Sequence, residues 1–243
     1  MKNMVMGMVV LFIVGCAYFW WSTNASLQDL DLPKAPFDKK VMDVQPDVLN
    51  QEKKWTTNFT HDGAIIKEGD TYYVFSTDYM VGGAPTPGIQ VRKSKDLINW
   101  QFTGRIFDEV SQEAFNWTGG NTFWAPSITK IKGTFYLYYS VSKVGSRTSY
   151  IGMTSASNIE GPWHDQGVVI ASKEGDGKTV NAIDPHVLKD QTGKWWMTYG
   201  SYFGGIFLTE INPNTGKLMK KSSEGKLLAK RKDMTMGIEG PEI

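Results

Sequence analysis

The sequence predicts an all-β fold in which repeated units are arranged around an axis, as in a β-propeller. From Trp55 onward, short alternating or aromatic-rich runs are each closed by Gly, Asn or Asp turns, which is the pattern of strands joined by hairpins. Similar segments recur about every 60 residues, and a unit of that length holds roughly four short strands, the content of one propeller blade. No stretch shows a convincing amphipathic helical pattern.

The repeats are visible in segments that share one pattern. Each has a distinctive residue pair, a short apolar strand ending in Lys, a Gly-containing turn and an aromatic strand. The segments are HDGAIIKEGDTYYVFS from His61, WAPSITKIKGTFYLYYS from Trp124 and IDPHVLKDQTGKWWMTYGS from Ile183. A further copy begins with EGPEI at Glu239, so we expect about three blades, the start of a fourth, and Ile243 in the first strand of that fourth copy. A solenoid of stacked β-layers is the competing arrangement, but its repeats are shorter.

Length and composition favour one domain with appendages and a neutral ligand. The chain has 243 residues, 41% hydrophobic and 13% aromatic, enough to bury a substantial core. A net charge of +1 gives no overall field that attracts nucleic acid or an anionic membrane, and we expect a monomer. Cys16 is the only cysteine, which excludes an intrachain disulfide and a cysteine-based metal cluster. Polar residues 26–54 are interpreted as a spacer, and residues 55–243 as the partial β-propeller domain.

The N-terminal residues predict export from the cytoplasm. Lys2 precedes an uncharged apolar stretch over residues 4–21, which is near the lower length limit for spanning a bilayer. Residues 1–25 are interpreted as a cleaved signal peptide, an uncleaved membrane anchor, or a lipid anchor at Cys16, where IVGC resembles a lipoprotein box. All three alternatives place the protein outside the cytoplasm, secreted or in the cell envelope, with membrane contact only through this segment.

The repeat geometry predicts where chemistry would occur. In a propeller the first strand of each blade lines the axis, so equivalent residues of successive blades meet at one end of the channel. The equivalent positions carry Asp62, Trp124, Asp184 and Glu239, three carboxylates and one indole. Each Asp alone could equally serve a turn or a cap. Three acids at one opening repel each other, however, and such clustering is costly unless a reaction uses it.

Glycoside hydrolysis is one such use, and the residues resemble a known family. The resemblance is to glycoside hydrolase family 43, and within it to the endo-α-1,5-L-arabinanases; it covers nearly everything from about residue 55 to the end. It implies a five-bladed β-propeller, of which this chain would be a fragment that is aggregation-prone and inactive when expressed alone. The residues that carry it are HDGAIIKEGDTYYVFST, FWAPSITKIKGTFYLYYSVS, IGMTSASNIEGPWHDQG, NAIDPHV, GSYFGGI and IEGPEI.

The resemblance also implies a role for each acid in a reaction that inverts configuration. Asp62 would be the general base that draws a proton from the attacking water, and Glu239 the general acid that protonates the departing glycosidic oxygen. Asp184 would orient that acid and favour its protonated form through like-charge repulsion. Inversion requires the Asp62 and Glu239 carboxyls to lie roughly 6.5 to 9.5 Å apart, whereas about 5 Å would favour retention.

Neighbouring residues are expected to bind the sugar. Trp124 could stack on a furanose ring, or it could be a buried blade aromatic; its equivalent position favours stacking. Asn181 and Ser201 resemble family positions that hydrogen-bond sugar hydroxyls, although turn chemistry would explain both nearly as well. Glu242 is an alternative acid three residues beyond the matched position, where an ordinary strand residue is the simpler interpretation.

No metal ligand is predicted from the sequence itself. The histidines at 61, 164 and 186 fit no zinc spacing, and no calcium-loop motif is present, so we expect hydrogen-bonded His side chains. The chemistry requires no cofactor. The resemblance implies a structural calcium ion in the channel, but no ligand for it can be named in this chain.

The expected substrate is arabinan or arabino-oligosaccharide, cut inside the polymer at α-1,5 linkages. Two alternatives stay open at this point. An exo-acting α-L-arabinofuranosidase or β-xylosidase of the same family would use the same acids in a closed pocket. A non-catalytic carbohydrate-binding propeller would use the aromatic residues for recognition and the acids only to bind hydroxyls.

Overall fold

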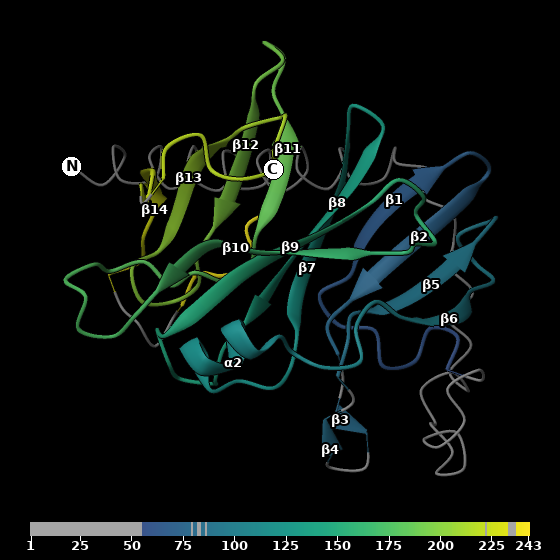
Figure 1. Ribbon diagram of the computed structural model, residues 1–243, viewed down its shortest axis with the longest axis horizontal. Helices are drawn as coiled ribbons and strands as arrows, with labels where there is room; N and C mark the ends of the chain where they lie inside the picture. The colour runs from purple at the N-terminus through teal and green to yellow at the C-terminus, as the bar shows by residue number, and fades with distance from the viewer. Residues whose placement is uncertain (1–54, 79, 82–83, 86, 222, 233–236) are drawn as a thin grey trace, which may run out of the picture. The chain divides into compact units, whose positions relative to one another are not determined.

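The computed structural model describes residues 55–243, apart from 79, 82–83, 86, 222 and 233–236 (Figure 1). These residues fall within one compact unit, Val44–Ile243. The interpretations of residues 1–25 as a signal or anchor, with Cys16, and of 26–54 as a spacer lie outside the described residues. Where the structure is described, no helix has the length and apolar content needed to cross a bilayer.

Three antiparallel sheets of four strands follow one another along the chain, as the labels and colours of Figure 1 show. The first sheet consists of β1 (Ala64–Glu68), β2 (Thr71–Ser76), β5 (Gln90–Ser94) and β6 (Gln101–Arg105). The second consists of β7 (Trp124–Ile131), β8 (Thr134–Val141), β9 (Ser149–Ala156) and β10 (His164–Ser172). The third consists of β11 (His186–Lys189), β12 (Trp195–Tyr199), β13 (Ile206–Ile211) and β14 (Lys226–Ala229). A short pair, β3 (Met80–Val81) and β4 (Ala84–Pro85), interrupts the first sheet in sequence.

This arrangement confirms the predicted all-β chain with four strands in each repeat. The hairpins form where the turn chemistry predicts them. Ile131 pairs with Thr134, so the β7–β8 loop has two residues, and both adopt positive φ, 51° at Lys132 and 87° at Gly133. Two left-handed residues match the twist of the flanking strands, which is why a glycine is favoured there.

The second sheet is buried on both faces. Along β8, Phe135, Leu137 and Tyr139 belong to a hydrophobic cluster shared with the first sheet. Tyr138, between them, belongs to a second cluster shared with the third sheet. Successive side chains of a strand point to opposite faces, so a strand between two sheets reads as a continuous apolar run rather than an alternation. This explains the sequence TFYLYYSV of β8.

The first strands of the three sheets lie beside one another. The strand β7 contacts both β1 and β11, as Figure 1 shows near the centre of the molecule. An ion pair of 2.6 Å between Lys130 Nζ and Glu68 Oε1 joins the first two sheets. Tyr138 donates a hydrogen bond of 2.8 Å to the Gly216 carbonyl, which joins the second sheet to the third. The residues that precede β1, β7 and β11 are thereby brought to one side of these strands.

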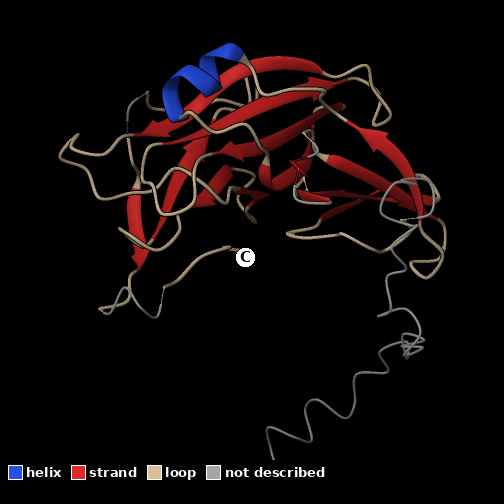
Figure 2. Ribbon diagram, turned by 90° about the horizontal axis from the view of Figure 1, so that it is seen from below, coloured by secondary structure: helices blue, strands red, loops and turns tan. Residues whose placement is uncertain are grey.

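The structure corrects two expectations. A helix, α2 (Gln112–Thr118, blue in Figure 2), packs against β8 and β9, although no helical pattern was evident. Seven residues are too few to show a 3.6-residue period, and the signals lie at the ends: Ser111 caps the first turn and Gly119, with φ of 66°, ends the last. The described residues from 237 to 243, Ile243 included, form no strand, because they pair with no ladder partner in the described part of the chain.

We expect Gly152→Ala to lower the free energy of unfolding by about 1 to 3 kcal/mol. Gly152 lies opposite Tyr139 in the β8–β9 pair, and a Cβ there would overlap the Tyr139 ring. The Tyr139 hydroxyl donates to Asp165 Oδ1 at 2.9 Å, so the ring cannot move away without losing that bond. Chemical denaturation measures the change. In a Tyr139→Leu background the same substitution should cost less than half as much, and equal costs in both backgrounds would contradict this explanation.

Candidate active site

A cavity of about 1140 Å³ opens where the three sheets begin. Asp62, Trp124, Asp184 and Glu239 all line it, so the structure brings together the four residues that the repeat spacing predicts. Their roles in a reaction stay predictions. The segments at 119–122, 125–127 and 240–242 also line the cavity.

A left-handed residue stands at or just before the start of the first strand of each described sheet, and another occurs at Gly240. The φ angle is 48° at Asp62, 39° at Ala125, 56° at Asp184 and 57° at Gly240. A non-glycine residue in this region costs about 1 kcal/mol or more, and such strain concentrates where a side chain must be aimed. Asp62 and Asp184 occupy the left-handed position itself, whereas Glu239 stands one residue before it.

One carboxylate oxygen of Asp62 is hydrogen-bonded within the protein, while the side chain stays accessible to water. The Thr77 hydroxyl donates to Asp62 Oδ2 at 2.8 Å, and His61 Nδ1 lies 2.9 Å from the same oxygen. The Asp62 side chain is 41% exposed, so a water molecule can reach its carboxylate. These are the requirements for a group that takes a proton from water.

Asp184 is less exposed than the other two acids and lies close enough to both for their charges to act on it. Burial raises the pKa of Asp184 to about 6, and the nearby negative charges of Asp62 and Glu239 contribute to the increase. The Gly240 N–H opposes it by donating to Asp184 Oδ2 at 3.1 Å.

Glu239 is exposed at the edge of the cavity. Ser201 donates to Glu239 Oε2 at 3.2 Å and also hydrogen-bonds to Asp184, so one buried hydroxyl links the two acids.

Ser201 and Asn181 are each 3% exposed, and neither lines the cavity. Asn181 Oδ1 accepts a hydrogen bond of 2.6 Å from Ser149. The contacts described for both residues are with the protein, and direct sugar binding by them stays a prediction.

Trp124 forms part of the cavity wall. Its side chain is partly exposed, and its Nε1 donates to Thr122 Oγ1 at 2.8 Å, which fixes the plane of the ring. Trp124 is therefore partly accessible from the cavity, and its stacking on a furanose ring stays a prediction.

The histidines make hydrogen bonds or lie at the surface. His186 Nδ1 accepts a bond of 3.1 Å from the Ile243 N–H, and burial lowers the pKa of His186 while Glu242 partly opposes that change. His164 is exposed on β10. Among the described residues, no group of three or more His, Cys, Asp and Glu side chains is placed to hold a metal, so the calcium implied by the resemblance finds no ligand set here.

Asp78 is a buried carboxyl in the cavity wall that the sequence analysis missed. Its Oδ2 accepts a hydrogen bond of 2.7 Å from the Phe123 N–H, and burial raises the pKa of Asp78 to about 7, against the opposing bonds from Phe123 and Gly88. The sequence signal is a carboxyl two residues after the aromatic strand β2, at a position where the second repeat has Val141.

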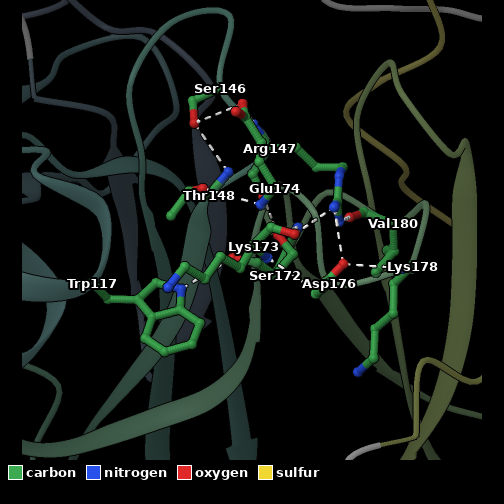
Figure 3. A network of polar contacts seen from close by, with 11 residues as sticks. Trp117, Ser146, Arg147, Thr148, Ser172, Lys173, Glu174, Asp176, Lys178 and Val180 are labelled. Atoms are coloured by element: carbon green, nitrogen blue, oxygen red, sulfur yellow. Dashed lines mark hydrogen bonds and ion pairs between the residues drawn. The ribbon is translucent and has the colours of Figure 1, made fainter.

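Arg147 fixes the loop that leads to Asp184, and it too was missed (Figure 3). Its guanidinium is buried and donates to the Val180 carbonyl at 3.2 Å, to Asp176 Oδ1 at 2.9 Å and to the Lys173 carbonyl. The planar guanidinium can donate to these three acceptors at once because its N–H groups have a fixed fork geometry, which a lysine ammonium lacks. No short sequence pattern marks Arg147, because its partners lie about thirty residues further along the chain.

Hydroxyl groups continue this network toward the site. Ser172 donates to the Arg147 carbonyl at 2.7 Å and accepts from the Ala182 N–H at 3.0 Å. Ser149 bonds Asn181, the residue before Ala182. The chain is therefore held on both sides of Asn181, three residues before the left-handed Asp184.

Comparison with known proteins identifies relatives of the described domain. The model of the family described as glycosyl hydrolases family 43 matches residues 55–243. An extracellular endo-α-(1→5)-L-arabinanase of Bacillus subtilis is 35% identical, covering 75% of this chain and 41% of that protein. An extracellular exo-α-(1→5)-L-arabinofuranosidase of Cellvibrio japonicus is 40% identical, covering 63% of this chain and 43% of that protein. The chain spans about half the length, or less, of the curated relatives it matches.

Solved structures give the same result. A native arabinanase of Bacillus subtilis superposes with a TM-score of 0.61 at 36% identity, covering 67% of this chain and 55% of that one. An α-L-arabinanase of Cellvibrio cellulosa in complex with arabinohexaose superposes with a TM-score of 0.59 at 37% identity, covering 66% of this chain and 50% of that one.

We expect Asp184→Asn to stabilise the protein above pH 6 and to have little effect near pH 4. The folded state favours the protonated carboxyl, since the pKa of Asp184 is about 6, above its ordinary value. The free energy of unfolding therefore falls as pH rises from the ordinary pKa of 3.8 to the folded-state value of about 6, by roughly 2 to 3 kcal/mol in all. The neutral amide of the Asp184→Asn variant does not ionise, so the variant does not lose this stability. Melting temperatures of the two proteins from pH 4 to pH 8, at constant ionic strength, measure the difference.

Asp190→Asn provides a control of opposite sign. Bonds from Trp196 and Thr192 lower the pKa of Asp190, so its replacement should destabilise the protein at pH 7 and less so at low pH. A melting difference for Asp184→Asn that does not vary with pH would show that its charge costs no folding energy.

Proposed function

The chain belongs to glycosyl hydrolase family 43, and from this premise we propose that the protein hydrolyses α-1,5-linked L-arabinan inside the polymer, with inversion of configuration. The observation that carries the proposal is the convergence of Asp62, Asp184 and Glu239 on one cavity. Relatives named as endo-arabinanases support the linkage and the internal cleavage.

The reaction we propose is a single displacement. Asp62 takes a proton from a water molecule, which attacks the anomeric carbon on the face opposite the leaving group. Glu239 donates a proton to the glycosidic oxygen, so that both products leave neutral. Asp184, buried and bonded to the Gly240 N–H, holds the segment that carries Glu239 and supplies the repulsion that opposes loss of the Glu239 proton.

The substrate is proposed to be arabinan or arabino-oligosaccharide. The complex of a similar arabinanase with arabinohexaose supports a binding site for several sugars, and a cavity of about 1140 Å³ is large enough for more than one ring. Trp124 would stack on a furanose ring. Ser201 and Asn181 would hydrogen-bond sugar hydroxyls, and the Ser201 hydroxyl also bonds Glu239 directly.

The three sheets are proposed to be blades of a five-bladed β-propeller, with residues 55–243 as part of the hydrolase domain. Relatives named as extracellular support export through residues 1–25, whether as a cleaved signal, an anchor or a lipoprotein at Cys16, with residues 26–54 as a spacer. The expectation of a monomer stays a prediction.

Exo-acting cleavage is the second candidate, and one observation favours it. The relative from Cellvibrio japonicus, named as an exo-acting arabinofuranosidase, is more identical to this chain than the endo-acting relative from Bacillus subtilis. The time course of products separates the two: endo cleavage gives a mixture of oligosaccharides early, whereas exo cleavage releases one short product throughout.

We expect Asp62→Ala, Asp184→Ala and Glu239→Ala, each made in the full-length protein, to lower kcat on linear arabinan by about 10³-fold or more. Binding of arabino-oligosaccharides, measured by calorimetry, should persist. Glu242→Ala is the matched control, because Glu242 lines the same cavity yet has no role in the proposed step. Unchanged sugar release from the three variants would indicate a non-catalytic binding protein, and loss in Glu242→Ala alone would move the acid role to Glu242.

A further inference from the structure

We propose that Thr77 is a positioning residue that aligns the candidate base Asp62 and couples it to the next sheet. This inference rests on the proposed function. Thr77 follows the last residue of β2, is buried, and contributes to the cavity wall beside Asp78. Nothing in its sequence context distinguishes it from an ordinary strand residue.

The donor and the acceptor in each of the two hydrogen bonds of the Thr77 hydroxyl can be assigned from the chemistry of its partners. Thr77 Oγ1 lies 2.8 Å from Asp62 Oδ2 and 2.8 Å from the Ala125 nitrogen. A backbone N–H can only donate, so the hydroxyl oxygen accepts from Ala125. An ionised carboxylate can only accept, so the single hydroxyl proton points at Asp62. The hydroxyl is therefore not free to rotate, and its donor is committed to the carboxylate.

These bonds connect two strained turns of adjacent sheets. Asp62 is the left-handed residue two positions before β1, and Ala125 is the left-handed second residue of β7. The Thr77 N–H also donates to the His61 carbonyl at 3.0 Å, which fixes the backbone beside Asp62. One residue thus sets the position of the base relative to Trp124, the neighbour of Ala125.

The arrangement recurs in the next repeat. Ser140, near the end of β8, occupies the position of Thr77 in the second sheet, and its Oγ accepts a hydrogen bond of 3.1 Å from the Asp184 N–H. In two successive repeats, therefore, a hydroxyl at this position accepts a hydrogen bond from the backbone N–H of the left-handed residue in the next repeat: Thr77 from Ala125, and Ser140 from Asp184. In the first repeat, the same hydroxyl also donates to a carboxylate of its own sheet.

The geometry leaves one oxygen of Asp62 for chemistry. Thr77 and His61 both contact Oδ2, and within the described residues no hydrogen bond reaches Oδ1. A donor on Oδ2 stabilises the charged carboxylate that a general base must be, and it orients Oδ1 toward the cavity. Thr77 therefore acts through Asp62 and does not touch the substrate.

The test is Thr77→Val in the full-length protein, which removes the hydroxyl and keeps the shape of the side chain. We expect kcat on linear arabinan to fall by about 10- to 100-fold, with KM changed by less than about threefold. The acidic limb of the pH profile of kcat/KM should move to higher pH, since a carboxylate without its donor is protonated more readily. Thr77→Ser, which restores the hydroxyl, should recover most of the rate.

Thr154→Val is the matched control for the loss of a buried hydroxyl. Thr154 is fully buried in β9, and its hydroxyl has no hydrogen-bond partner among the described residues. This variant should keep the wild-type kcat and pH profile. A folded Thr77→Val protein with wild-type kcat and an unmoved acidic limb would overturn the proposal. If Thr77→Val does not fold, Thr77→Ala and the same two readouts decide.

A measurement without activity separates this proposal from the proposed function. Thr77→Val should lower the melting temperature less in an Asp62→Ala background than in the wild type, because one of its two bonds is already absent there. An inactive wild-type protein that shows this coupling would refute arabinan cleavage and retain the Thr77–Asp62 bond. Equal melting losses in both backgrounds would overturn the role of Thr77 whether or not the enzyme is active.

Discussion

A residue in the left-handed region stands at the start of the first strand of each described sheet, two residues before β1 and β11 and second in β7, and the placement of three carboxylates around one cavity depends on these turns. Asp62, Ala125 and Asp184 adopt it without being glycine, and Gly240 repeats it. The turn is unfavourable by itself, so it persists because bonds from neighbouring sheets hold it. The N–H of Ala125 donates to Thr77, that of Asp184 to Ser140, and that of Gly240 to the Asp184 carboxylate.

The site is stabilised by parts of the molecule that take no part in the chemistry. The second sheet is apolar on both faces, and it fixes the spacing of β1, β7 and β11 through the two hydrophobic clusters. The buried guanidinium of Arg147 holds the loop before Asp184. Against this support, the charge of Asp184 destabilises the fold above pH 6, as is common where charges cluster at a proposed active site.

Much of this organisation could be predicted from the sequence, because repetition is a signal that one chain carries by itself. The spacing of the segments at His61, Trp124 and Ile183 predicted the four-stranded units and the convergence of the acids. The helix α2 was missed since its seven residues show no period and only its caps mark it. Asp78, Thr77 and Arg147 were missed for another reason: their roles come from partners in other sheets or distant loops, which local patterns do not reveal.

The account is tested most directly by a crystal structure of the full-length protein with a bound arabino-oligosaccharide. It predicts a glycosidic bond between the Asp62 and Glu239 carboxyls, a separation of roughly 6.5 to 9.5 Å between them, and a furanose ring against Trp124. Carboxyls only about 5 Å apart would contradict inversion. An oligosaccharide bound away from all three acids would contradict the assignment of the cavity as the active site.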